Sequence, residues 1–360
     1  MDKRLNCANL TAAMDQAGLN SAALARELSV SRESVRKWLS GESFPRPDKL
    51  LRLGKTVGLS FGDLIIKEEP HAPVVAFRKM RGTKTKDHHI ENAQTMGRML
   101  RHLVSFLPFD VLAMPPVLKD PSTNYDYLKK VGQLIRHEIH VGALEPIDFS
   151  HLIRHFGKLQ ATIVPVMWGS KKVHENATHI YLPDSQTTWV YLNLDVNIHD
   201  FKFWMAHELG HCLAPQLRGD EAEDFADAFA SALLCPHETA STVYTTISKY
   251  KSTKKKLNSI VQLAEEHTIS PITLYKQMNA FAASENLTPL TLEPDIHKWT
   301  TQFNKQYLNV SETLFDGEMP PEAKAFIEIT SDAFETPFFD ILERYLKETH
   351  KGPGYVQTVM

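Results

Sequence analysis

Apolar and polar residues alternate along the first 66 residues with the spacing of short helices. Apolar positions recur every three or four residues in four stretches, which predicts helices at residues 9–16, 22–28, 32–39 and 48–57. Asn20 and Ser21 are a start signal for the second helix, and "SVS" at residues 29–31 predicts a turn before the third. Gly41 and the prolines after it end the third helix. The pattern predicts a helical domain over residues 1–66.

The rest of the chain mixes helical and strand patterns. Residues 67–90 have the composition of a linker, and residues 91–140 have helical spacing interrupted by a proline-bearing stretch. Segments rich in β-branched and aromatic residues predict strands at 159–168, 178–183 and 189–194. Helical patterns follow to residue 285, and residues 286–360 continue with a mixed helical pattern. The predicted fold class is mainly α with a small β-sheet (α+β), divided into domains 1–66 and 91–285 and a C-terminal region 286–360 of unassigned role.

Composition and charge narrow the class of protein. A hydrophobic content of 42% and a charged content of 23% are typical of soluble globular proteins. No stretch reaches the roughly 20 apolar residues that span a bilayer, and the N-terminal residues lack the apolar core of a signal peptide. We therefore expect a cytoplasmic protein with no membrane partner. The three cysteines are too few for a disulfide framework, and the net charge of −3 means that any contact with nucleic acid needs a local basic surface.

The second and third predicted helices have the spacing of a helix-turn-helix. Apolar residues would pack these helices against each other: Leu24, Ala25 and Leu28 on one side, and Val30, Val35 and Trp38 on the other. This packing leaves four polar residues on the outward face of the third helix: Arg32, Glu33, Arg36 and Lys37. A recognition helix uses such side chains to reach base edges and phosphates. Residues 1–66 contain ten Lys and Arg against seven Asp and Glu, so this domain is positive in a negative chain.

The segment "VSRESVRKWLSGE" and the proline after it resemble the XRE family of lambda-repressor-like DNA-binding domains, over nearly all of residues 21–64. The resemblance implies double-stranded operator DNA as a partner, contacted through the four polar residues of the third helix. Glu33 is unusual on a reading face, because a carboxylate repels phosphate and contacts only cytosine N4. Such domains usually read paired half-sites, which leaves a homodimer as one option. A helical module for protein contacts is the alternative interpretation.

Two histidines stand four residues apart in the motif "HELGH" at residues 207–211. On a helix these positions share one face, so His207 and His211 can bind one ion, with Glu208 near its open side. This is the H-E-x-x-H pattern of zinc peptidases, in which the two histidines hold the metal and the glutamate is a general base. Two histidines on an apolar helix can also be satisfied core residues, and the motif alone leaves both interpretations open.

A catalytic zinc needs a third protein ligand. Pro215 and Gly219 break the first helix, and the alanine-rich helix that begins near residue 220 can return close to it. Glu223 lies about one turn into that second helix, where it can deliver a carboxylate to the ion, with Glu221 as the alternative ligand. Asp227, one turn further on the same face, is placed to orient a ligand histidine.

Two segments, "FWMAHELGHCLAP" and "EDFADAFASALLCP", resemble the ImmA/IrrE family of metallopeptidases, over roughly residues 130–285. The resemblance implies a zincin-like domain in which His207, His211 and Glu223 hold Zn²⁺ and Glu208 is the general base. The upstream segment "YLNLD" supports the resemblance as an edge strand, and we expect residues 190–194 to receive an extended substrate by strand addition.

The chain departs from the family pattern at two positions. Asp227 stands where asparagine is usual, which preserves the ability to accept a hydrogen bond, and Cys235 stands where methionine is usual. Manganese or iron is an alternative to zinc.

The two resemblances together predict a DNA-associated, zinc-dependent endopeptidase in transcription regulation, whose protein substrate is a repressor. One alternative is a transcriptional regulator whose zinc domain senses a ligand or metal without cleaving. Another is an antitoxin-like module whose peptidase fold is only an interaction surface. Glu208 favours catalysis, because a sensor needs ligands but no general base.

Other polar residues give weaker signals. His174 and His179 lack a partner acid at a useful spacing, which predicts surface histidines. His237 and Tyr244 follow the second zinc helix and are candidates for polarising a scissile carbonyl, with a surface or packing role as the alternative.

Overall fold

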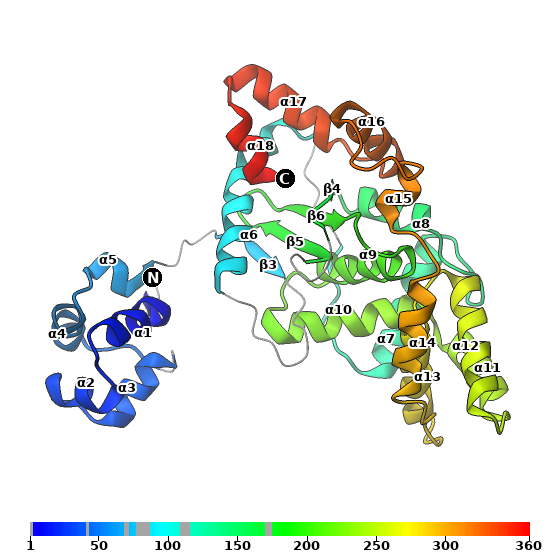
Figure 1. Cartoon of the computed structure of the whole chain (residues 1–360), viewed down its shortest axis with the longest axis horizontal. Helices are drawn as coiled ribbons and strands as arrows, with labels where there is room; N and C mark the ends of the chain where they lie inside the picture. The colour runs from blue at the N-terminus through cyan, green and yellow to red at the C-terminus, as the bar shows by residue number, and fades with distance from the viewer. Residues whose placement is uncertain (1–2, 41–42, 68–71, 77–86, 109–115, 170–174) are drawn as a thin grey trace. The chain divides into compact units, whose positions relative to one another are not determined.

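The computed structural model describes residues 3–40, 43–67, 72–76, 87–108, 116–169 and 175–360 (Figure 1). The chain divides into two compact units, Met1–Ala72 and Pro73–Met360. The fold is mainly helical with a small sheet, as the hydrophobic pattern predicts. None of the helices in the described ranges is long and apolar enough to cross a membrane.

The first unit is a small helical domain closed by two short strands. Its elements are β1 (Lys3–Leu5), α1 (Cys7–Gln16), α2 (Ser21–Glu27), α3 (Arg32–Leu39), α4 (Pro47–Val57), α5 (Phe61–Leu64) and β2 (Ile65–Lys67). The four predicted helices are confirmed, each within two residues of its expected bounds. The two strands were not predicted, because three residues carry too little periodicity. They pair antiparallel and join the two ends of the unit.

Helices α2 and α3 form the predicted helix-turn-helix. Asn20 begins α2 by accepting hydrogen bonds from the backbone N–H groups of Ala22 and Ala23, and Ser31 caps α3 in the same way. Ser29 between them has a φ of 52°, so the chain turns through the left-handed region. The apolar residues expected between the helices share one core: Leu24, Ala25, Leu28, Val35 and Trp38 are buried, and Val30 packs against them.

The second unit is built on a four-stranded sheet with the order β3 (Val74–Ala76), β5 (Ala177–Leu182), β6 (Thr187–Asn193) and β4 (Ala161–Val166). β4 and β6 are parallel, and the other two pairs are antiparallel. The pattern predicts β4, β5 and β6 but not β3. The expectation of an edge strand at residues 190–194 is wrong, because β6 pairs with β5 on one side and β4 on the other.

Both faces of the sheet are buried, and each has its own core. Side chains alternate along β6, so Val190 and Leu192 join one core while Trp189 and Tyr191 join the other. The first core includes α9 (Ile198–Leu213) and α10 (Gly219–Leu234). The second includes α6 (Asp87–Leu100), η1 (Arg101–Phe106), α17 (Phe338–Thr349) and α18 (Pro353–Val359), which cover the opposite face (Figure 1).

The remaining helices support this framework. They are α7 (Tyr125–Glu138), α8 (Phe149–Lys158), α11 (His237–Ser248), α12 (Thr253–His267), α13 (Pro271–Ser284), α14 (Asp295–Asn304), α15 (Val310–Leu314) and α16 (Ala323–Ala333). α7 and α13 lie beside α10, and α8 lies beside β4 and α9.

The domain boundaries differ from those expected. Residues 286–360 belong to the second unit: α14 packs on α12 and α13, and the Ser311 N–H donates to the Leu194 carbonyl at 2.8 Å. The segment expected as a linker, residues 67–90, contains the last residue of β2, all of β3 and the start of α6. Residues 68–71 and 77–86 of that segment lie outside the described residues.

Helices α9 and α10 approach each other closely around one glycine. A Cβ atom added to Gly210 would lie 3.1 Å from Ala226 Cα and 3.1 Å from Phe229 Cδ1. A Cβ atom at this position would therefore require Ala226 or Phe229 to shift by a few tenths of an ångström. The small surface of α10 contributes to the approach, since Ala222, Ala226 and Ala230 are all buried. Side chains of α9 and α10 therefore meet across a short gap.

Candidate functional site

Two histidines meet on the buried side of α9. His207 and His211 stand one helical turn apart, and their Nε2 atoms are 3.1 Å from each other. His207 is exposed at 1% and His211 at 4%. The helix begins at Asn197, which caps it, and runs through a largely apolar segment, so the pair faces the interior. The structure thus brings together the two histidines that the motif predicts as ligands.

The second helix supplies a carboxylate. Glu223 Oε1 lies 3.4 Å from His211 Nε2, and Glu223 Oε2 lies 3.5 Å from His207 Nε2. The three potential ligand atoms lie within 4.8 Å of one another, and the described residues contain no second group of this kind. Glu221, the alternative ligand, is exposed and is not a member of this His₂Glu cluster.

Asp227 contacts the far nitrogen of His207. His207 Nδ1 and Asp227 Oδ1 are 3.0 Å apart. A carboxylate only accepts hydrogen bonds, so Nδ1 carries the proton and donates it. In neutral His207 the lone pair is then on Nε2, which faces His211 and Glu223. The contact is the one expected for Asp227 from its position one turn after Glu223.

Glu208 is a buried acid beside the cluster. It is exposed at 2%, and its Oε2 atom has no hydrogen-bond partner among the residues that the structure describes. Burial raises the pKa of Glu208 to about 8, although the neighbouring His207 lowers it. A buried carboxylate oxygen without a donor costs free energy, and such groups concentrate at functional sites.

The cluster has a strongly polarised environment. Burial lowers the pKa of His207, but hydrogen bonds to Asp227 and Glu223 outweigh it and raise this pKa to about 10. Burial also lowers the pKa of His211. Burial raises the pKa of Glu223, but its bonds to both histidines outweigh that effect and bring the pKa to about 2. The carboxylates of Glu223 and Asp227 therefore stabilise a positive charge at the two histidines.

The donor set fits Zn²⁺. Two imidazole nitrogens and one carboxylate oxygen are a known zinc ligand set that keeps a fourth position open. The two facing Nε2 atoms can share only one proton, so at least one lone pair points into the cluster. Glu223 Oε2 is buried and lies 3.5 Å from His207 Nε2, a long contact that leaves this oxygen available to a further partner. A metal ion would satisfy these acceptors together.

The expectation that His179 is a surface histidine is wrong. His179 lies on β5, is exposed at 3%, and its ring centroid is 5.6 Å from that of His211. Its Nε2 has no hydrogen-bond partner in the described ranges, and burial lowers its pKa well below the ordinary value, so the ring is neutral. The alternation of side chains along a strand could have indicated this burial, because it places His179 on the same face as Ala177, which belongs to the core around α9. His174 lies outside the described residues.

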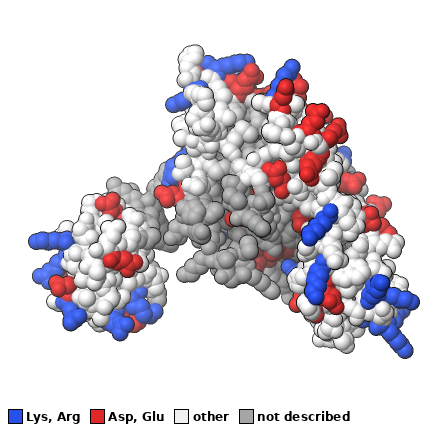
Figure 2. Space-filling view, viewed as in Figure 1, with Lys and Arg blue, Asp and Glu red and all other residues white. Residues whose placement is uncertain are grey.

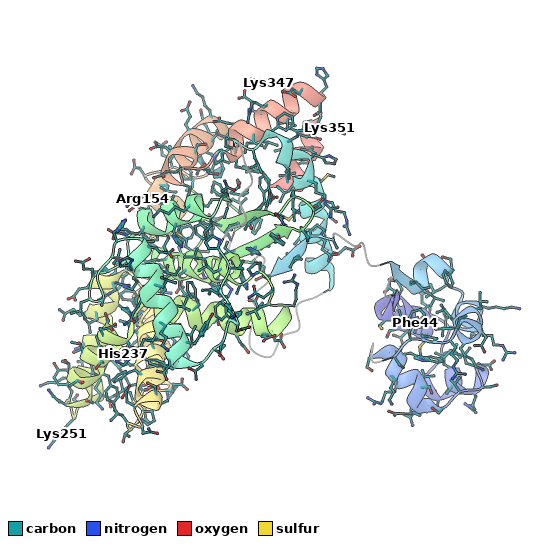
Figure 3. All side chains as sticks on the ribbon, turned by 180° about the vertical axis from the view of Figure 1, so that it is seen from behind. Phe44, Arg154, His237, Lys251, Lys347 and Lys351 are labelled. Carbon is teal, nitrogen blue, oxygen red and sulfur yellow. The ribbon has the colours of Figure 1, made fainter. Side chains whose placement is uncertain are left out.

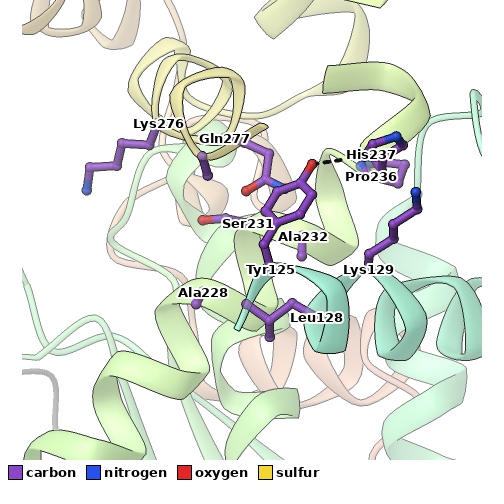
Figure 4. Close-up of a pocket in the computed structure, with 11 residues that line it drawn as sticks. Tyr125, Leu128, Lys129, Ala228, Ser231, Ala232, Pro236, His237, Lys276 and Gln277 are labelled. Atoms are coloured by element: carbon purple, nitrogen blue, oxygen red, sulfur yellow. Dashed lines mark hydrogen bonds between the residues drawn. The ribbon is translucent and has the colours of Figure 1, made fainter. Parts of the chain in front are cut away.

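His237 and Tyr244 lie apart from the cluster. His237, labelled in Figure 3, has its Nδ1 atom 3.3 Å from the Tyr125 hydroxyl, in a pocket of about 160 Å³ between α7, α10, α11 and α13 (Figure 4). The described lining of this pocket includes no member of the His₂Glu cluster. The Tyr244 hydroxyl donates to the Thr288 carbonyl at 2.5 Å. These contacts favour the packing role for both residues.

The outward face of α3 carries the four residues expected to contact DNA. Arg32, Glu33, Arg36 and Lys37 are all exposed, and Figure 2 shows Lys and Arg side chains over the surface of the first unit. Arg36 donates to Glu33 twice, from Nη2 to Oε1 at 2.8 Å and from Nε to Oε2 at 3.1 Å. The hydrogen bonds from Arg36 lower the pKa of Glu33. Glu33 thus holds Arg36 in a defined orientation, and an exposed pair of this kind costs little to open.

The role of Asp227 predicts a graded loss of zinc affinity. Asp227→Ala should weaken zinc binding about 10- to 100-fold, because His207 loses the acceptor that orients its ring. Asp227→Asn keeps an acceptor and should lose much less. Asp224→Ala removes an exposed carboxylate from the same helix and is the matched control. Competition with a chromophoric zinc chelator measures these affinities, and equal values for Asp224→Ala and Asp227→Ala would contradict the assigned role.

The face of α3 predicts opposite effects of two kinds of variant on DNA binding. Arg36→Ala with Lys37→Ala should weaken binding to double-stranded DNA. The logarithm of the association constant should also fall less steeply with the logarithm of the salt concentration, with a slope smaller in magnitude by about 2. Glu33→Gln should strengthen binding, because it releases Arg36 and removes a charge that repels phosphate. Arg52→Ala with Lys55→Ala removes the same charge from α4 and is the control. Fluorescence anisotropy at several salt concentrations measures the affinities and the slopes. An equal loss of DNA affinity in the α3 and α4 double variants would contradict a DNA contact through α3.

A comparison with known families agrees with the geometry of the first unit. A family model described as Helix-turn-helix matches residues 10–64, the segment that contains α2 and α3. Searches of curated proteins and of solved structures gave no match to the chain. The resemblance of residues 130–285 to the ImmA/IrrE family therefore stays a prediction. The first unit is a helix-turn-helix domain, which supports DNA binding and a role in transcription regulation.

Proposed function

We propose that the second unit is a zinc-dependent endopeptidase of the ImmA/IrrE type, which cleaves a repressor-type protein. The observation that carries this proposal is Glu208. Its carboxylate is buried beside His207, and its Oε2 atom has no hydrogen-bond partner among the described residues. A site that only bound a metal would need His207, His211 and Glu223 but no further acid at this position.

The proposed reaction assigns a role to each residue. His207, His211 and Glu223 would hold zinc, and Asp227 would keep the His207 ring in place. When bound, zinc supplies a Lewis acid that polarises a carbonyl group and makes water nucleophilic at neutral pH. Glu208 accepts a proton from the attacking water and passes it to the leaving amine of the cleaved peptide.

The helix-turn-helix unit supplies the link to regulation. It would bring the chain to operator DNA or to a repressor of similar fold. A second candidate function is regulation without cleavage, in which the second unit senses a ligand or metal or binds a partner. The match of residues 10–64 favours a regulator directly, whether or not the chain cleaves.

The substitution Glu208→Gln separates these two functions. It should reduce cleavage about 10²- to 10⁴-fold, because the general base is lost, while zinc content stays at that of the parent chain. Glu221→Gln, at an exposed acid of α10, is the matched control and should cleave normally.

The measurement is intact-protein mass spectrometry of a helix-turn-helix repressor co-expressed from a neighbouring gene, with elemental analysis of the purified chain. Loss of both cleavage and bound zinc in the Glu208→Gln variant would indicate that Glu208 is a zinc ligand instead of the general base. Undiminished regulation of a target promoter by the Glu208→Gln variant would contradict the endopeptidase proposal. It would support regulation without cleavage.

A further inference from the structure

The strand beside the cluster is β5, not β6. His179 of β5 contacts a member of the cluster, with its ring centroid 5.6 Å from that of His211. β5 is antiparallel to its inner neighbour β6, so its other side is the one on which a further strand can add. Peptides commonly bind by adding a strand to such an edge, where main-chain hydrogen bonds give affinity and alternate side chains give specificity. On the proposed function, a substrate of this site would lie along β5.

A segment of this chain already occupies that position. β3 pairs antiparallel with β5, with Val74 opposite Tyr181 and Ala76 opposite His179. Its Cα atoms also come within 8 Å of α10, the helix that carries Glu223 (Figure 1). Val75 packs into the core on the opposite face of the sheet. Alternation therefore puts Val74 and Ala76 on the same side as His179 and the cluster.

The placement of β3 resembles that of a bound peptide. It has three residues, one neighbouring strand, and side chains that are all half-buried. By contrast, β4 and β6 pair over six residues and are fully buried. β3 also follows directly on the first unit, which ends at Ala72. A short strand with one partner gains few ladder hydrogen bonds, so another strand can replace it at modest cost.

We propose that β3 occupies the substrate-binding edge of the peptidase as an internal competitor. This edge is the outer side of β5. Its substrate is an extended peptide with small and β-branched apolar residues, like those of β3 itself. This proposal rests on the proposed endopeptidase and names its substrate class. With an attached competitor, the apparent affinity for an external peptide is the intrinsic affinity multiplied by the fraction of time for which the edge is free.

The test measures peptide binding in the zinc-loaded full chain carrying Glu208→Gln, which prevents cleavage of the probe. The probe is a fluorescein-labelled peptide with the sequence of residues 72–76, Ala-Pro-Val-Val-Ala. Val74→Asp with Ala76→Asp puts two charges at half-buried positions opposite Tyr181 and His179 and should displace β3, because burying these charges is costly. Leu134→Asp with Leu144→Asp adds the same charge at two exposed leucines elsewhere and is the matched control.

We expect the displaced variant to bind the probe at least about tenfold more tightly than the parent, with the control unchanged. Hydrogen exchange should show the β5 amides losing protection in the displaced variant and regaining it when the probe is added. If the aspartates unfold the second unit, Val74→Gly with Ala76→Gly gives the same test without added charge.

Two different failures can be told apart. Equal affinity of the displaced and parent chains for the probe overturns the assignment of the edge, even if a repressor is cleaved. Tighter binding by the displaced variant, combined with no cleavage of probe or repressor when Glu208 is intact, keeps the edge as a peptide-binding site and rejects the endopeptidase.

Discussion

The close approach of α9 and α10 is the constraint on which the candidate site depends. Gly210 lies against Ala226 and Phe229, where a Cβ atom would be 3.1 Å from each, and both Glu223 oxygens lie within 3.5 Å of a histidine. The cluster is therefore held by two buried helices, and its geometry is coupled to the packing of the surrounding core. Sites built on packed helices are held more precisely than sites built on loops.

Lys202 shows how a buried charge can be satisfied by backbone carbonyls in the second unit. Lys202 is exposed at 2%, and its ammonium group donates to the carbonyls of Ile147 and His267 at 2.7 Å each. Glu208 Oε2 and His179 Nε2 have no such partner in the described part of the chain. His207, Glu208 and Glu223 also have perturbed pKa values within one short stretch of two packed helices, and perturbed groups gathered in this way favour a chemical role over simple packing.

Local features of the sequence are enough to predict the four main helices of the first unit and the His₂Glu cluster of the second. Caps and helical spacing predict α2 and α3, and the histidine pair with the alanine-rich return helix predicts the contact between His211 and Glu223. The strand arrangement was not predictable in this way, because it depends on pairing between distant segments. β3 is too short to be recognised by its pattern, and β6 is central only because β4 joins it in parallel. The burial of His179 follows from that arrangement, which puts β5 over α9.

The proposed function depends on one cation held by His207, His211 and Glu223. Zinc-edge X-ray absorption of the full chain loaded with one equivalent of zinc tests this assignment most directly. We expect a shell of nitrogen and oxygen ligands with the scattering pattern of two imidazoles. A shell that contains sulfur, which would draw in Cys212 or Cys235, or one without imidazole scattering, would contradict it.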